Sequence, residues 1–305
     1  MKTLVSAFLL LLVVTAPGAA MAGKLSKKEK DKYGTTYWGK FKHAPYPSKG
    51  KKYKDSTIAA FVPRHFCSTL MKIREKRKGA RSRKTYECYS EKEYGRLKKK
   101  KHTRVRKVTR IDYVVHYHGH SNTVAKTFRN HRLREQFSLS LQNAVLVVPQ
   151  GPINAIDSDF GKVERRRGFR KMLMEVHGFL QDQGVIGKKQ KIGRIIITSH
   201  SGGYRATAMA LKHGGLEVSE VYMFDSLYAH VDIFFAWLTN PEKTARRLIN
   251  VYYRKKPKAR SKELLALLEG AGVRVKKLTE KKMRSKKFKR KSLGRERIIF
   301  IRTNQ

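Results

Sequence analysis

The sequence predicts an α/β fold with a mostly parallel sheet, helices on both faces and a basic N-terminal extension. Over residues 110–303, continuous apolar runs of five or six residues alternate with amphipathic segments, a pattern typical of strands buried on both faces and separated by helices. Hydrophobic residues make up 40% of the 305 positions, which is enough for a sizeable core. After the N-terminus no apolar run approaches the roughly 20 residues needed to cross a bilayer, which excludes a multi-span membrane protein.

The expected elements follow one another in a strand–helix order. Strands are expected at Arg110–Tyr117, Ala144–Val148, Arg194–Thr198, Val221–Phe224, Leu248–Tyr253 and Arg297–Ile301. Helices are expected at Thr123–Leu141, Gly168–Gln183, Tyr204–Lys212, Ile233–Leu238 and Ser261–Leu268. Shorter strand-like runs precede them at Thr57–Val62 and Thr85–Tyr89. Right-handed crossovers bring the loops after parallel strands to one edge of the sheet, so chemistry is expected there.

The N-terminal residues 1–22 have the composition of a signal peptide. A lysine at position 2 precedes the apolar core Leu4–Ala16, and Ala20-Met21-Ala22 forms a small-x-small site with cleavage after Ala22. The alternative is an uncleaved membrane anchor, for which the core is short. We therefore expect export to the periplasm or out of the cell. Residues 23–57 lack periodicity and are expected to form a basic, poorly ordered arm before an α/β domain at 58–305.

Cysteine and charge content add two further expectations. Cys67 and Cys88 are the only cysteines in the sequence. Export favours a disulfide between them over free buried thiols. A zinc site is poorly supported, because two thiols supply only half of the ligands that zinc requires. The 70 Lys and Arg against 23 Asp and Glu give a formal charge of +47, concentrated in runs such as Lys98–Arg110 and Lys281–Lys291. These runs predict salt-sensitive, sequence-independent binding to a polyanion, either an anionic cell-envelope polymer or nucleic acid.

A serine stands in the turn between the third expected strand and its helix, in Ser199-His200-Ser201-Gly202-Gly203. A tight strand-to-helix turn exposes the Ser201 hydroxyl above the sheet, and the amide of Gly202 lies at the helix N-terminus, where an oxyanion is favoured. Such a turn requires small residues two before and two after the serine, which Ser199 and Gly203 satisfy. The alternative is a Ser/Gly turn that only caps the helix.

These residues resemble the nucleophile elbow of the α/β-hydrolase superfamily, and the resemblance covers residues of about 110–303. It implies a serine hydrolase that acts through a covalent acyl-enzyme on Ser201. It also implies that His118-Gly119-His120, after the first strand, supplies the second oxyanion donor, at the amide of His120 or its neighbour. Alternating His116, His118 and His120 could instead bind zinc, although no Asp or Cys follows at ligand spacing.

The remaining members of a catalytic triad are harder to place. Asp225 ends the strand after the elbow helix, where a carboxylate can orient an imidazole, or alternatively cap the next helix. The superfamily order predicts a histidine after the last strand, but no histidine follows His230. His230 could substitute, the chain could stop short of a histidine-bearing loop, or the site could be inactive. The acids of 157–164 are a further candidate for contacts with substrate, or else a solvated loop.

Two functions follow from the sequence. The first is an exported serine hydrolase that cleaves an ester or amide without cofactor or metal, using Ser201, Asp225 and His230, with Gly202, Gly119 and His120 around the oxyanion. The second is a catalytically incomplete protein of the same fold that binds a polyanion through its basic runs. An intact elbow favours the first, and the missing histidine favours the second.

Overall fold

The computed structural model describes residues 23–304, apart from 79–80, 90–92, 94–104, 155–157, 286–287, 289–292 and 295. The expected signal peptide and its cleavage site at Ala22 lie outside this range, as do five of the eight Lys and Arg residues of each basic run. The strands are β1 (Lys24–Lys30), β2 (Gly34–Lys40), β3 (Thr57–Pro63), β4 (Leu70–Lys78), β5 (Arg81–Tyr89), β6 (Arg106–Lys107), β7 (Arg110–Tyr117), β8 (Ala144–Pro149), β9 (Lys191–His200), β10 (Glu220–Phe224), β11 (Arg247–Tyr252), β12 (Lys276–Thr279) and β13 (Ile298–Arg302). The helices are α2 (Val124–Asn130), α3 (Leu133–Leu139), α4 (Gly168–Asp182), α5 (Tyr204–His213), α6 (Val231–Thr239), α7 (Lys255–Gly270) and α8 (Glu280–Arg284), with short 3₁₀ turns at η1 (Gly161–Glu164), η2 (Ser201–Gly203) and η3 (Pro241–Lys243).

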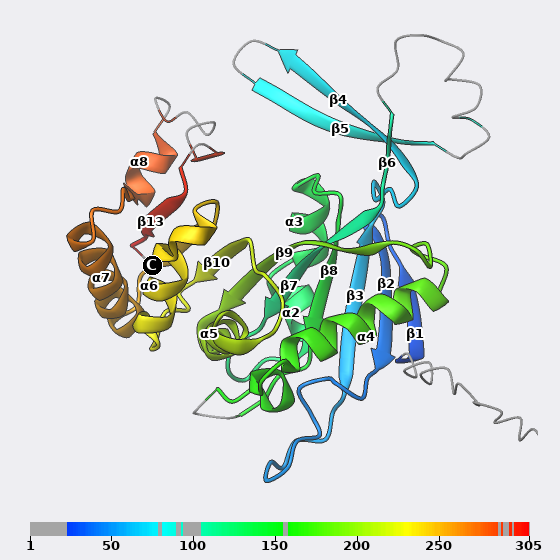
Figure 1. The fold of residues 1–305 in the computed structure, drawn as a ribbon, viewed down its shortest axis with the longest axis horizontal. Coiled ribbons are helices and arrows are strands. Elements are labelled where there is room, and N and C mark those ends of the chain that lie inside the picture. The colour runs from blue at the N-terminus through cyan, green and yellow to red at the C-terminus, as the bar shows by residue number, and fades with distance from the viewer. Residues whose placement is uncertain are drawn as a thin grey trace, which may run out of the picture.

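A ten-stranded sheet in the order β1-β2-β3-β8-β7-β9-β10-β11-β13-β12 forms the centre of the molecule (Figure 1). The strands from β8 to β12 along this order pair in parallel, whereas β1, β2 and β3 pair antiparallel at one edge. The predicted α/β class with a mostly parallel sheet is confirmed. Parallel pairing aligns the carboxyl ends of β7, β9 and β10 at one edge, where the candidate site lies.

Helices cover the two faces of the sheet unequally. On one face α4, α5, α6 and α7 pack against the apolar side of the strands and form the largest core cluster, as Figure 1 also shows. On the other face a smaller cluster joins α2 and α3 to β3, β7, β8 and β9. The expected single helix at Thr123–Leu141 is divided in two, because Arg132 adopts a left-handed conformation with φ of 48° and turns the chain between α2 and α3.

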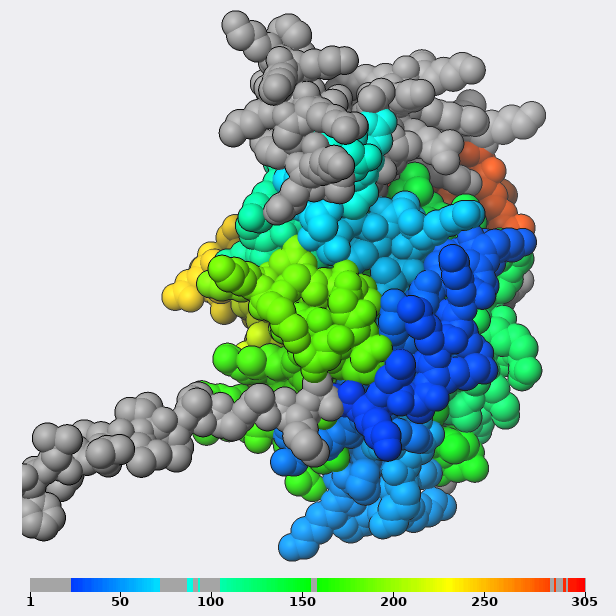
Figure 2. Space-filling model, turned by 90° about the vertical axis from the view of Figure 1, so that its right-hand side faces the viewer, coloured from blue at the N-terminus to red at the C-terminus, as the bar shows by residue number. Residues whose placement is uncertain are grey.

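The expected disordered arm at 23–57 is corrected by the structure, because it contributes strands β1 and β2 to the sheet. β1 is an exposed edge strand rich in lysine, so backbone pairing rather than a buried face holds it. Farther along, Phe41 packs edge to face on Phe179 of α4, and Glu175 accepts the amides of Lys42 and His43. Figure 2 shows this N-terminal segment, in dark blue, lying directly against α4 in green.

The predicted disulfide between Cys67 and Cys88 is present. It ties the base of a second, three-stranded sheet, β5-β4-β6, whose hairpin β4–β5 stands away from the main sheet (Figure 1). Asn143 anchors this base to the domain, since its side chain accepts the amide of Cys67 and donates to the Cys67 carbonyl.

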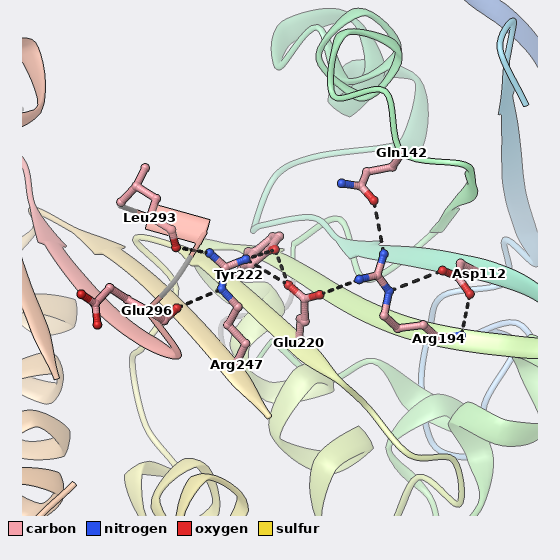
Figure 3. A network of polar contacts seen from close by, with 8 residues as sticks. All are labelled: Asp112, Gln142, Arg194, Glu220, Tyr222, Arg247, Leu293 and Glu296. Atoms are coloured by element: carbon pink, nitrogen blue, oxygen red, sulfur yellow. Dashed lines mark hydrogen bonds and ion pairs between the residues drawn. The ribbon is translucent and has the colours of Figure 1, made fainter. Parts of the chain in front are cut away.

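An alternating row of charges crosses the amino-terminal side of the parallel strands (Figure 3). Arg194 of β9 contacts Asp112 of β7 and donates to Glu220 of β10 at 3.0 Å. Arg247 of β11 donates to the other oxygen of Glu220 and to the Tyr222 hydroxyl. Each strand thus offers the charge opposite to that of its neighbour, which fixes the register of β7, β9, β10 and β11 at the end remote from the candidate site.

Candidate active site

Ser201 occupies a strained turn between β9 and α5. Its φ is 48°, a left-handed value that is uncommon for a residue with a side chain. Gly203 is required at this turn, because a Cβ there would lie 2.4 Å from the carbonyl oxygen of Tyr117. The side chain of Ser201 is half-buried at the carboxyl edge of the sheet. The chain therefore turns sharply at Ser201 between strand and helix, where the sequence predicted a nucleophile elbow, and residues 199–203 are called the elbow below.

The turn after β7 lies directly against the elbow. A Cβ on Gly119 would stand 2.8 Å from the Cβ of Ser201 and 3.2 Å from the carbonyl oxygen of His200. The backbone amide nitrogen of His120 lies 3.5 Å from the position that a Cβ on Gly202 would take. The structure therefore brings together four residues singled out by sequence, Ser201, Gly202, Gly119 and His120, from two separate strands.

His118 holds the turn after β7 from inside the protein. It is 1% exposed, and its Nε2 accepts the amide of Gly151 at 2.8 Å, so the ring is neutral and carries its proton on Nδ1. Nδ1 donates to the carbonyl oxygen of Gly119 at 2.8 Å. Burial lowers the pKa of His118 to about 4. The sequence suggested a zinc ligand as the alternative here, but both ring nitrogens are engaged by protein groups.

Ser226 makes the corresponding contact to the elbow, and no pattern in the sequence indicated it. Its hydroxyl is fully buried and donates to the carbonyl oxygen of Ser201 at 2.8 Å. Ser158, from the loop after β8, also contacts the elbow, since its Oγ lies 2.5 Å from the position of a Cβ on Gly202. Both serines reach the site through tertiary packing alone.

Asp225 lies at the carboxyl end of β10, one strand away from the elbow. It is buried, has a φ of 48°, and accepts the amides of Tyr253 and Arg254 through Oδ1. The Arg254 side chain lies 3.4 Å from Oδ2. Backbone amides and one arginine thus hold the carboxylate in place, and the N-cap of the following helix α6 is His230 instead of Asp225.

His200 faces the opposite side of the elbow from α5. It lines a cavity of about 530 Å³ between α3 and the sheet, together with His116, His131 and apolar strand residues. Burial, followed by the nearby His131 and Arg254, lowers the pKa of His200 to about 4, while the Asp225 carboxylate acts in the opposite sense. Asp225 and His200 also line one smaller cavity at the sheet edge. The acid is therefore electrostatically coupled to His200.

His230, which the sequence offered as a substitute for the missing catalytic histidine, lies on a different element from His200. It precedes α6 with a φ of 63°, is half-buried, and its ring lies 6.0 Å from that of Tyr204, three residues after Ser201. Burial lowers the pKa of His230, and the carboxylate that acts on it is Asp232. In the described part of the chain neither His230 nor His200 is hydrogen-bonded to the Ser201 hydroxyl.

The two described acids of the 157–164 loop are bound within the protein. Asp157 lies outside the described residues. Asp159 pairs with Lys51 and accepts the amide of Gly161, and Glu164 accepts the Arg205 side chain at 2.8 Å. Burial raises the pKa of Glu164 to about 7. These contacts join the loop to α5 instead of presenting both acids to a substrate.

Two further observations concern metals and membranes. Across residues 23–304 as described, no group of three or more His, Cys, Asp or Glu side chains is arranged to hold a metal ion. Within the same described residues, no helix combines the length and apolarity required to traverse a bilayer.

The mostly parallel sheet, its strand order and the helices on both faces together give an α/β-hydrolase-like fold. No protein-family model matches the chain, and no curated protein matches its sequence. Among solved structures the chain is similar to fluorophosphonate-binding serine hydrolase F of Staphylococcus aureus, with a TM-score of 0.48 and 9% identity over 90% of this chain and 91% of that one. It is also similar to a ferulic acid esterase (TM-score 0.45, 10% identity, 82% and 83% covered) and to the feruloyl esterase module from Clostridium thermocellum (0.44, 8%, 93% and 81%).

Proposed function

We propose that this protein is a serine hydrolase that cleaves an ester or amide through a covalent acyl-enzyme on Ser201. The observation that carries the proposal is the left-handed φ of Ser201 in a turn whose glycines leave no room for a Cβ. A strained conformation at a non-glycine residue persists only where the surrounding structure enforces it, and such strain clusters at active sites. A serine that merely capped α5 would need no such turn.

The proposed chemistry begins with attack of Ser201 Oγ on the substrate carbonyl. The negative charge that develops on the carbonyl oxygen is stabilised by the amides of Gly202 and His120, whose backbones are adjacent. The leaving group departs with a proton, and water then releases the acyl group from Ser201. Gly119 permits the close approach of the two turns that this arrangement requires.

The proton of Ser201 needs a base, which we assign to His230. His200 is held at a pKa of about 4, which makes it a weak base at neutral pH. His230 is half-buried, and its ring lies beside that of Tyr204, three residues after Ser201. Asp225 then acts on the site through its charge, without a direct contact to His230.

A fluorophosphonate probe tests this assignment directly. Wild-type protein should be labelled and Ser201→Ala should not, with circular dichroism showing that both are folded. His230→Gln should slow labelling by a factor of about 100 or more, as expected for loss of a general base. His200→Gln serves as the matched histidine control and should retain labelling. An unlabelled wild type would exclude an activated serine, and slow labelling only in His200→Gln would transfer the role of base to that residue.

Export is part of the same proposal. The apolar core of residues 4–16 and the small residues before position 23 support secretion with cleavage after Ala22. N-terminal sequencing of protein recovered from the periplasm or medium of an expressing cell should give Gly23 as the first residue. Recovery of uncleaved chain from the membrane fraction would contradict it.

A second function, binding of a linear phosphodiester polyanion, is favoured by the hairpin β4–β5. Its register places Lys76 opposite Arg83 and Lys78 opposite Arg81. The backbone register thus brings basic residues to facing positions along the two strands, and a phosphodiester chain carries the complementary charge. The hairpin also stands away from the main sheet (Figure 1).

Salt-dependent binding of an oligodeoxythymidylate, used as a sequence-neutral polyanion, tests the hairpin. The variant Lys76→Ser/Arg83→Ser should reduce the slope of log affinity against log salt by about 1.4, since each phosphate contact on a single strand contributes about 0.7. The matched control Arg77→Ser/Lys84→Ser removes the same charge from the alternate positions and should change the slope less. Equal effects of the two variants would show that only net charge matters.

A further inference from the structure

We propose that Ser226 and His118 are positioning residues that orient the two backbone amides of the oxyanion site from behind. The inference rests on the proposed function for the identity of that site. Ser226 Oγ donates to the carbonyl oxygen of Ser201, and His118 Nδ1 donates to the carbonyl oxygen of Gly119, each at 2.8 Å. These are the carbonyls of the peptide units that end in the amides of Gly202 and His120.

Peptide geometry turns each of these contacts into a constraint on an amide. A peptide unit is planar, and in the trans form its C=O and N–H point in opposite directions. The peptide bonds after Ser201 and Gly119 are both trans, since the cis bond in the described residues is the one between Tyr46 and Pro47. A donor that fixes the carbonyl oxygen therefore fixes the direction of the N–H on the other side. Hydrogen bonding to the oxygen also polarises the unit and strengthens its N–H as a donor.

Both donors are themselves held rigidly. Ser226 is fully buried, and Asp225 before it is anchored through Oδ1 by the amides of Tyr253 and Arg254. His118 is fixed through Nε2 by the amide of Gly151. Donors that must reorient during the reaction stabilise an oxyanion less, so the oxyanion site requires donors that are already oriented. The contacts that hold Ser226 and His118 meet this requirement.

Ser226→Ala removes one of these contacts, and Ser261→Ala provides a matched control. Ser261 is equally buried, and its hydroxyl accepts a hydrogen bond from Asn250 at 2.8 Å, so its loss carries a similar cost in stability. Ser261 lies on α7 and contacts neither amide. For the second donor, His118→Asn keeps an N–H near the position of Nδ1, whereas His118→Ala removes it.

The first readout is independent of catalysis. The ¹⁵N chemical shift of Gly202 responds to the hydrogen bond on the carbonyl of its own peptide, so it should move in Ser226→Ala and stay unchanged in Ser261→Ala. Unchanged Gly202 resonances in Ser226→Ala would overturn the inference, whether or not the protein reacts with a probe.

The second readout is the rate of fluorophosphonate labelling. We expect Ser226→Ala and His118→Ala to lower the maximal labelling rate at least tenfold, at unchanged apparent affinity, because complete loss of one oxyanion donor costs about 10²–10³. Ser261→Ala and His118→Asn should label at nearly the wild-type rate. Equal losses in Ser226→Ala and Ser261→Ala would show that Ser226 has only a structural role. An unlabelled wild type would refute the proposed hydrolase, and the ¹⁵N shift of Gly202 would then decide by itself whether Ser226 orients the peptide.

Discussion

Acidification should destabilise this protein through His118. The ring is buried and neutral, and its Nε2 accepts the Gly151 amide. Protonation would place a second donor where that acceptor is needed. Because the pKa of His118 falls from 6.5 to about 4 on folding, the unfolded chain binds the proton more tightly across that interval. Stability is therefore fully present above pH 6.5 and declines as the pH falls toward 4.

The size of this effect follows from the two pKa values. Each unit of difference corresponds to about 1.4 kcal/mol, so one such histidine contributes a loss of about 3 kcal/mol between pH 6.5 and pH 4. Burial also lowers the pKa values of His116 and His200, so the whole protein should lose more than this. The contribution of His118 alone is the difference between wild type and a variant that lacks the titrating group.

Urea denaturation followed by circular dichroism at these two pH values measures that difference. His118→Asn keeps a donor toward Gly119 but does not titrate. Its free energy of unfolding should fall by about 3 kcal/mol less than that of wild type over the same interval. An identical decline in the two proteins, or an NMR titration of His118 with a midpoint near 6.5, would refute the reasoning.

Three shorter predictions test other parts of the structure. Gly119→Ala should abolish fluorophosphonate labelling and cost about 1–3 kcal/mol in urea denaturation, since the new Cβ would lie 2.8 Å from that of Ser201; retained labelling would contradict the close approach of the two turns. Glu220→Gln should cost about 1–2 kcal/mol, because it leaves two arginines facing each other across the sheet, and a stability equal to wild type would contradict this. Cys67→Ser/Cys88→Ser should cost about 3 kcal/mol by loop entropy and expose the hairpin to trypsin, whereas unchanged proteolysis would show that Asn143 anchors it unaided.

Much of the fold is predictable because burial on both faces leaves a strong signal in the sequence. Strand β7 has the expected bounds Arg110–Tyr117, and α4 and β10 differ from expectation by a single residue at one end. β1 was missed because an edge strand of lysines is stabilised by backbone pairing, which has no hydrophobic period. The division between α2 and α3 was missed because the left-handed conformation of Arg132 has no glycine to signal it.

The strand-to-helix turn at Ser201 could be predicted from sequence because so tight a turn restricts the residues that fit. Small residues around Ser201 and a strand before it are local requirements, and they are visible in five consecutive letters. Cys67 and Cys88 were likewise paired by their number and the expected export. The sequence by itself therefore determined the fold class and the disulfide, and it predicted the turn at which Ser201 stands.

The tertiary structure alone decided how the site is supported. Ser226 and Asp225 contact residues that are 25 or more positions away in the sequence. His118 contacts a carbonyl whose direction depends on the local turn. The tertiary structure also brings the Asp225 carboxylate close enough to act on the pKa of His200. In the same way it places the ring of His230 beside that of Tyr204. Local sequence encodes the backbone conformations that residues require, whereas the direction of a hydrogen bond and the burial of a charge depend on which strands the chain brings together.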